Sequence, residues 1–115
     1  MTLVTFADHF IGQSCLQRSI DQDTGEMVMV QEARIQGDTA HLVATMKRNQ
    51  VSTAQCQAFW ASFREELKRL KVTVIIGYVN AQMLDHYFTH YQMCDSGDRI
   101  QHPHLGELRV CVQRL

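Results

Sequence analysis

The sequence predicts a mixed α/β fold, a mostly antiparallel sheet with a parallel central pair of strands and helices on both faces. Residues 72–79 form a short apolar run rich in β-branched side chains, which is typical of a strand buried on both faces. A long amphipathic pattern over residues 52–70 precedes this run, and a helical crossover between two strands normally makes them parallel. Alternation over residues 107–115 predicts a final antiparallel strand.

The N-terminal part of the chain predicts one strand, one helix and one turn. Residues 3–6 are an apolar opening that suits a first strand. Large apolar residues then recur at near-helical spacing and predict a helix over residues 6–19. The polar stretch 21–25 predicts a turn with Gly25 in the left-handed conformation.

A β-hairpin is predicted next, from two apolar runs around a turn signal. Residues 27–35 form the first strand, the turn is Gln-Gly-Asp-Thr at 36–39, and residues 41–47 return. Strict alternation in the return strand puts one set of side chains on each face. The two sets are Leu42, Ala44 and Met46 on one face, and His41, Val43, Thr45 and Lys47 on the other.

The long helix has both a start signal and an apolar stripe. Ser52 and Gln55 have the spacing of a capping box, so a helix is expected to begin there. The apolar residues that follow repeat at three- and four-residue intervals and indicate a face packed on the sheet. They are Cys56, Phe59, Trp60, Phe63, Leu67 and Leu70.

A second strand–helix unit and a closing hairpin complete the pattern. Asn80 follows the central strand and is expected to cap a helix. The apolar face of that helix comprises Met83, Leu84, Tyr87, Phe88 and Tyr91. A weak strand at 94–100, interrupted by a turn signal at 95–98, precedes the final strand.

Composition narrows the classes of partner and location. The 115 residues suit one domain, 1–115, and 11 basic against 12 acidic residues give no electrostatic reason to expect nucleic acid. We expect no membrane partner, since no apolar run approaches the roughly 20 residues that span a bilayer. Without a signal-peptide pattern, the four scattered cysteines are expected to be reduced thiols in a cytoplasmic protein.

The order of elements, with Val-Ile-Ile-Gly-Tyr-Val-Asn at 74–80 and Tyr87 seven residues later, resembles the GCN5-related N-acetyltransferase (GNAT) superfamily. The resemblance covers the C-terminal half of the family fold, roughly residues 39–115. The first 38 residues are too short for the family's first strand, helix pair and second strand. One element is therefore expected to be missing or fused, as in a short, degenerate, phage-type member.

The resemblance also implies where acetyl-CoA and a catalytic acid would lie. In the family, the loop before the long helix holds the cofactor's pyrophosphate through a glycine-containing pattern. Here Asn49, Ser52 and Ala54 occupy the pattern positions, and the loop has no glycine. Tyr87 matches the family tyrosine that protonates the leaving thiolate, although its place on an apolar helix face also fits plain packing. For the general base, Glu32 and His41 are the candidates.

These observations leave three functional hypotheses. The first is a non-catalytic GNAT-like protein without cofactor that binds another protein, such as a phage virion-assembly protein or inhibitor in the host cytoplasm or the virion. The alternative is an active acetyl-CoA-dependent N-acetyltransferase. The third is a metal enzyme that uses His86 and His90 with His102 or His104 as a third ligand, although we expect these histidines to bind no metal. The final strand, if at an edge, offers a route to a homodimer.

Overall fold

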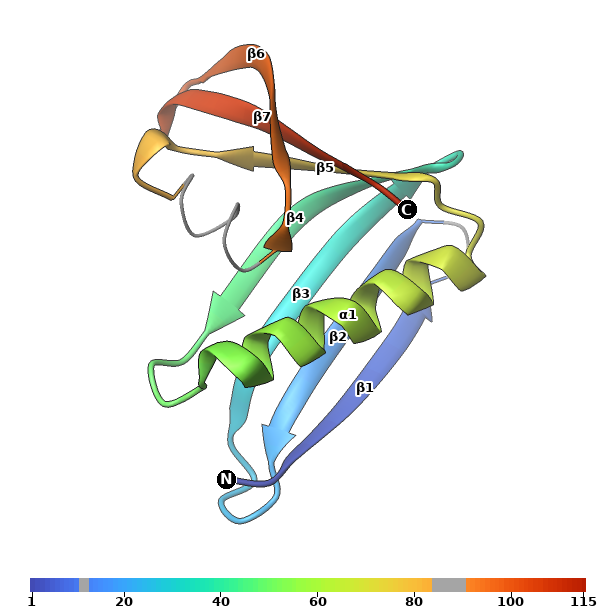
Figure 1. Cartoon of the computed structure of the whole chain (residues 1–115), viewed down its shortest axis with the longest axis vertical. Coiled ribbons are helices and arrows are strands. Elements are labelled where there is room, and N and C mark those ends of the chain that lie inside the picture. The colour runs from blue at the N-terminus through green and yellow to red at the C-terminus, as the bar shows by residue number, and fades with distance from the viewer. Residues whose placement is uncertain (11–12, 84–90) are drawn as a thin grey trace.

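The chain folds into one seven-stranded sheet with a long helix across one of its faces (Figure 1). The computed structural model describes residues 1–10, 13–83 and 91–115. The elements in chain order are β1 (Leu3–Phe10), β2 (Ser14–Asp21), β3 (Met27–Gln36), β4 (Thr39–Lys47), α1 (Thr53–Arg69), β5 (Val74–Val79), the short 3₁₀ helix η1 (Ala81–Met83), β6 (Cys94–His102) and β7 (Gly106–Arg114).

The sheet topology confirms the predicted mixed fold. The strand order is β1-β2-β3-β4-β5-β7-β6, and every neighbouring pair is antiparallel except β4 and β5. The parallel pair is joined through α1, as the crossover pattern predicts. The two hairpin turns contain glycines with positive φ, Gly25 at 73° and Gly37 at 61°, which agrees with the predicted turns.

The prediction of a helix over residues 6–19 is wrong, because this segment forms β1 and β2. The burial of β2 alternates strictly, and its buried side chains are Cys15, Gln17, Ser19 and Asp21. Polar residues on the buried face conceal the two-residue period of a strand from a reading based on hydrophobicity. Only three residues, 11–13, link β1 to β2, so a helix pair cannot fit between these strands.

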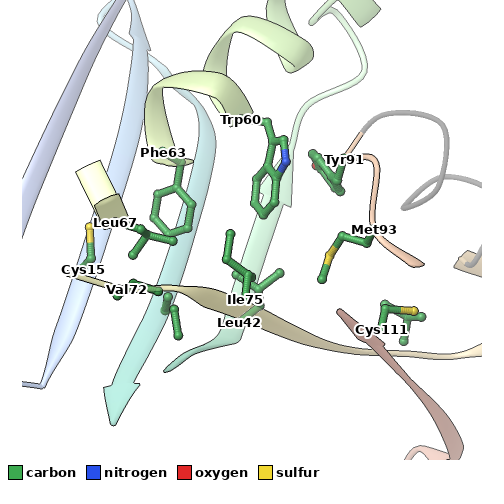
Figure 2. Packing of buried hydrophobic residues seen from close by; sticks show 13 residues of the cluster. Cys15, Leu42, Trp60, Phe63, Leu67, Val72, Ile75, Tyr91, Met93 and Cys111 are labelled. Carbon is green, nitrogen blue, oxygen red and sulfur yellow. The ribbon is translucent and has the colours of Figure 1, made fainter. Parts of the chain in front are cut away.

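The long helix is confirmed together with its cap. Ser52 accepts a hydrogen bond from the Gln55 N–H at 3.1 Å, and the Gln55 side chain accepts one from the Ser52 N–H at 2.9 Å. The predicted stripe is buried in five of its six positions, and Leu70 is half-buried. Figure 2 shows Trp60 lying between Phe63 and Tyr91, with residues of β4 and β5 on the sheet side.

Two details of the predicted layers differ from the structure. Within the described ranges the sheet carries a single α-helix, on one face, so the prediction of helices on both faces is not met there. Strand β5 is buried on the α1 side only, because Ile75, Gly77 and Val79 are buried while Tyr78 is 38% exposed. The helix predicted after Asn80 falls largely on residues 84–90, outside the described residues.

The closing hairpin is confirmed, with a correction to its edge. β7 pairs with both β5 and β6, so the final strand is internal and cannot pair with a second copy through a free edge. The edges of the sheet are β1 and β6. The turn signal at 95–98 lies within β6 as a bulge, where the register shifts between Asp95 and Arg99. No helix among the described residues has the length and apolar character needed to cross a membrane.

Candidate active site

The central parallel strands, β4 and β5, separate after three residue pairs. Strands β4 and β5 pair from Thr39↔Val74 to His41↔Ile76, and no later pair joins them. Beyond this point β4 stays paired with β3 and β5 stays paired with β7, so the two halves of the sheet diverge (Figure 1). The backbone of residues 42–47 therefore presents hydrogen-bonding groups that no β5 partner uses.

A β-bulge in β4 lies at the start of this fork. Ala33 pairs with Leu42 while Glu32 pairs with Ala44, so Val43 is an extra residue without a partner on β3. The bulge also changes which side chains share a face. Thr45 pairs with the buried Gln31, and it thus lies on the α1 side with Leu42, which corrects the strict alternation predicted for this strand.

The fork opens into a cleft of about 440 Å³. Its described lining comes from β4, β5, η1, the segment before β6 and the β6–β7 hairpin. The lining residues are Thr45, Lys47, Tyr78, Val79, Asn80, Met83, Tyr91, Leu105 and Leu108. The bulky side chains of Met46 and Phe59, which would have plugged the gap, are not among them.

The loop after β4 brings the start of α1 next to the cleft. A surface hollow of about 470 Å³ is lined by residues 46–50 and shares Lys47 with the cleft. The capping box occupies the N–H groups of Ser52 and Gln55. Within the described part of the chain, the N–H groups of Thr53 and Ala54 have no hydrogen-bond partner, so they are the donors left for an anion.

The three residues assigned to the cofactor pattern lie in this loop and in the first turn of α1, with different surroundings. Asn49, Ser52 and Ala54 are all exposed. Ser52 already serves the helix as its N-cap, and Ala54 offers its backbone N–H. Val51 between them is buried against the core under α1, where it fixes the loop without a glycine. Tyr87, the predicted acid, lies outside the described residues.

Of the two candidate bases, His41 has the more specific environment. Its Nδ1 lies 3.1 Å from the Tyr78 hydroxyl, and the two rings are parallel within 3°. This contact bridges β4 and β5 where the parallel ladder ends, because His41 belongs to its last residue pair. Glu32 lies on β3 opposite Ala44. The pairing of His41 with Tyr78, 37 residues away, has no signal in the sequence because it depends on the register of two strands.

A metal site finds no support in the described part of the chain, which holds no group of three or more His, Cys, Asp or Glu side chains able to bind an ion. His86 and His90 lie outside it. The third-ligand candidate His102 uses its Nδ1 to accept the N–H groups of His104 and Leu105, at 3.1 and 3.0 Å. It therefore acts as a cap for the β6–β7 turn.

Three of the four cysteines, those that are buried, are poor nucleophiles. Burial raises the pKa of the Cys15 thiol to about 11, and the nearby carboxylates of Glu66 and Asp8 add to this effect. Burial also raises the pKa values of Cys56 and Cys111 above 9.0. Since the thiolate is the reactive form, these three thiols are protected both by access and by protonation.

We therefore expect one of the four thiols, the exposed Cys94, to react rapidly with Ellman's reagent in the native protein. Denaturation should release the remaining three. Absorbance at mixing measures the count, and Cys94→Ser should abolish the fast phase. A fast phase from more than one thiol would contradict the buried positions of Cys15, Cys56 and Cys111.

Solved structures of acetyltransferases share this architecture. The Bacillus cereus IAA acetyltransferase superposes with a TM-score of 0.72 at 6% identity, over 99% of this chain and 100% of that one. A Bacillus subtilis acetyltransferase in complex with CoA gives 0.69 at 11% identity, over 99% of both chains. The PaiA N-acetyltransferase of Thermoplasma acidophilum, also with coenzyme A, gives 0.66 at 10% identity, over 90% of this chain.

This chain has the GNAT fold. The likeness to the GNAT family extends beyond residues 39–115, because all seven strands are present and β1 to β3 belong to the same sheet. What the short N-terminal part lacks is room for the GNAT helix pair between β1 and β2. The chain spans 62% of the length of the Thermoplasma protein. No protein-family model and no curated protein matches the sequence.

Proposed function

We propose that this GNAT-fold protein is an acyl-CoA-dependent N-acyltransferase that binds acetyl-CoA in the fork between β4 and β5. The open fork is the observation that carries the proposal. A non-catalytic descendant has no reason to keep 440 Å³ of cleft between two core strands, since closing it would bury more apolar surface. Val79, Tyr91 and Leu108 line the cleft, and nearly all of the surface of each of these residues is buried.

The residues present fit the cofactor at both ends of the cleft. At the loop, the partner-free N–H groups of Thr53 and Ala54 and the Lys47 cation suit a diphosphate. Along the fork, the unpaired edge of β4 offers donors and acceptors to an amide-bearing extended arm, as an edge strand does for a peptide. The bulge at Val43 turns the β4 backbone at the start of the fork.

When bound, acetyl-CoA supplies a thioester carbonyl as the electrophile. The protein's own contribution is to exclude water along an apolar cleft, to orient the thioester and to assist two proton transfers. One proton leaves the acceptor amine, and one must reach the departing sulfur. Tyr87 is the residue that the GNAT resemblance offers for the second proton, and it stays a prediction.

The decisive experiment is calorimetric titration with acetyl-CoA, using two variants of the cap residue. Ser52→Asp keeps a good N-cap side chain and places a negative charge where the diphosphate would lie, whereas Ser52→Asn caps equally well without charge. We expect micromolar binding by the wild-type protein, a loss of roughly tenfold or more in Ser52→Asp from charge repulsion, and little change in Ser52→Asn.

The same titration tests the second candidate function, a non-catalytic protein-binding role such as virion assembly or inhibition. Two observations favour that role, namely the missing room for a helix pair and a loop whose first amides are already capped. It predicts no heat on titration with acetyl-CoA at concentrations far above micromolar. In that case the acyltransferase proposal fails for the wild-type protein and the cytoplasmic or virion binding role takes its place.

A further inference from the structure

His41 and Tyr78 form the one side-chain hydrogen bond that bridges the described parts of β4 and β5 at the fork. The His41 Nδ1 and the Tyr78 hydroxyl are 3.1 Å apart, and the ring centroids are 6.2 Å apart in parallel planes. His41 belongs to the last residue pair of the parallel ladder, and Tyr78 lies two residues further along β5, past the divergence. The pair is thus fixed by both strands at the place where they separate.

The pair lies on the face of the sheet opposite α1. Ile75, Gly77 and Val79 point toward the core under α1, so Tyr78 between them points the other way. Within the described ranges no helix covers that face, and the link of three residues between β1 and β2 leaves no room for one there. Tyr78 is 38% exposed as a result, and His41 is half-buried. Both side chains are accessible from solvent.

Tyr78 also borders the main cleft at the fork. A second, smaller cavity of about 230 Å³ is lined by Leu42, Val43, Ala44, Thr45 and Tyr78. It shares Thr45 and Tyr78 with the main cleft, so the two cavities adjoin at these residues. A molecule that arrives over the uncovered face therefore meets the Tyr78 side chain where these two cavities adjoin.

The charged neighbours of this place come from β3. Arg34 lies directly opposite His41, and Glu32 lies opposite Ala44 beside the smaller cavity. Neither makes an ion pair within the described part of the chain. On β7, the residue opposite Tyr78 is the apolar Val110. Glu32 thus places one free carboxylate near the cavity, where it attracts a cation such as an ammonium group.

On this geometry we propose that Tyr78 and His41 form a proton relay that deprotonates a cationic amine acceptor arriving over the uncovered sheet face. Tyr78 would touch the acceptor, and His41 would act through it. The inference rests on the proposed acyltransferase function and adds the route of the acceptor and the fate of its proton.

The relay balances without any further reactant. The ammonium proton passes to the Tyr78 oxygen while the Tyr78 hydroxyl proton passes to the lone pair of His41 Nδ1. The neutral amine then forms the new bond to the thioester carbonyl carbon. As the carbon–sulfur bond breaks, the nitrogen gives up its second proton and the departing sulfur takes one up, so the products are the amide and the free thiol. His41 releases the extra proton to water from its half-exposed ring, which restores the starting state.

The test compares acetyl transfer to two probe amines in wild-type, Tyr78→Phe and His41→Gln proteins. 2-Phenylethylamine is a cation at neutral pH, whereas hydroxylamine is largely uncharged. We expect both variants to lose about 100-fold in kcat/KM with 2-phenylethylamine at neutral pH, a typical contribution of proton transfer. The loss should shrink at alkaline pH and be much smaller with hydroxylamine. His104→Gln, an exposed histidine in the β6–β7 turn, is the matched control.

Acetyl-CoA binding, measured in parallel, separates the possible failures. If acetyl-CoA binds but the variants match the wild-type rates, the relay is overturned while the cofactor proposal stands. The same conclusion holds if acetyl-CoA binds but the wild-type protein accelerates transfer to neither amine. A loss that is equal for both amines at every pH indicates a structural role and also overturns the relay. If the wild-type protein does not bind acetyl-CoA, the acyltransferase function and the relay fail together.

Discussion

Replacement of Phe63 by alanine is expected to lower the free energy of unfolding by about 3–5 kcal/mol, the usual cost of deleting a buried phenylalanine ring. Phe63 is 0% exposed and lies at the centre of the α1–sheet interface. Its ring centroid is 5.8 Å from that of Trp60, and Figure 2 shows both rings directed at the sheet. Its loss leaves a cavity that neighbours anchored on β4 and β5 cannot refill.

Urea denaturation followed by circular dichroism measures this change, and Phe6→Ala is the matched control. Phe6 is 46% exposed on β1, so the same substitution should cost less than about 1 kcal/mol there. Similar losses for the two variants would mean that α1 does not pack as described. The consequence reaches the proposed site, because α1 carries the loop and the partner-free N–H groups of Thr53 and Ala54.

The parts of the fold that the sequence predicts are those whose cause is local. The long helix has a visible cap in Ser52 and Gln55 and an apolar stripe with helical spacing, and both are confirmed. The parallel pair follows from the helical crossover between β4 and β5, and the hairpins follow from their glycine turns. Each of these signals comes from one continuous segment of the chain.

The prediction fails at β1 and β2 for a physical reason. On β2 the side chains that face the core are mostly polar, and their burial depends on hydrogen bonds to distant segments. Gln17, for example, donates from Nε2 to the backbone oxygen of Phe59 at 2.7 Å, and the Ser19 hydroxyl lies 2.7 Å from that of Thr5. A hydrophobicity pattern cannot show that such residues are inside, because their partners lie on other elements.

The candidate site was predicted only in part, since it is a property of register. The sequence identifies the loop with Asn49, Ser52 and Ala54 and names His41 as a candidate base. It does not reveal the bulge at Val43 or the end of the parallel ladder, both of which depend on how neighbouring strands pair. The missing loop glycines indicate loss of function, whereas the described residues that line the fork include neither of the expected plugs, Met46 and Phe59.

Replacement of Gln113 by leucine is expected to destabilise the protein by about 3 kcal/mol and to loosen one wall of the cleft. The Gln113 side chain, 9% exposed, accepts a hydrogen bond from Trp60 Nε1 at 3.2 Å. Its amide nitrogen donates to the backbone oxygens of Tyr91 and Gln92, at 3.0 and 3.1 Å. Leucine has a similar size but cannot make these three hydrogen bonds, and the loss of a buried hydrogen-bond partner costs about 1–3 kcal/mol.

The position of Gln113 makes this more than a loss of stability. Gln92 has a φ of 56°, an unfavourable value for a residue other than glycine, so the surrounding contacts must hold it there. Tyr91 lines the cleft, and its ring centroid lies 4.8 Å from that of Trp60.

Trp60 is the single tryptophan, so a red shift of native fluorescence in Gln113→Leu reports the opened wall directly. Gln101→Leu on the exposed strand β6 should leave both fluorescence and stability unchanged. A native Gln113→Leu protein with unshifted emission and wild-type stability would show that the segment before β6 is held by other contacts. The expected accompanying loss of acetyl-CoA affinity would tie Gln113, which never touches the cleft, to the function proposed for it.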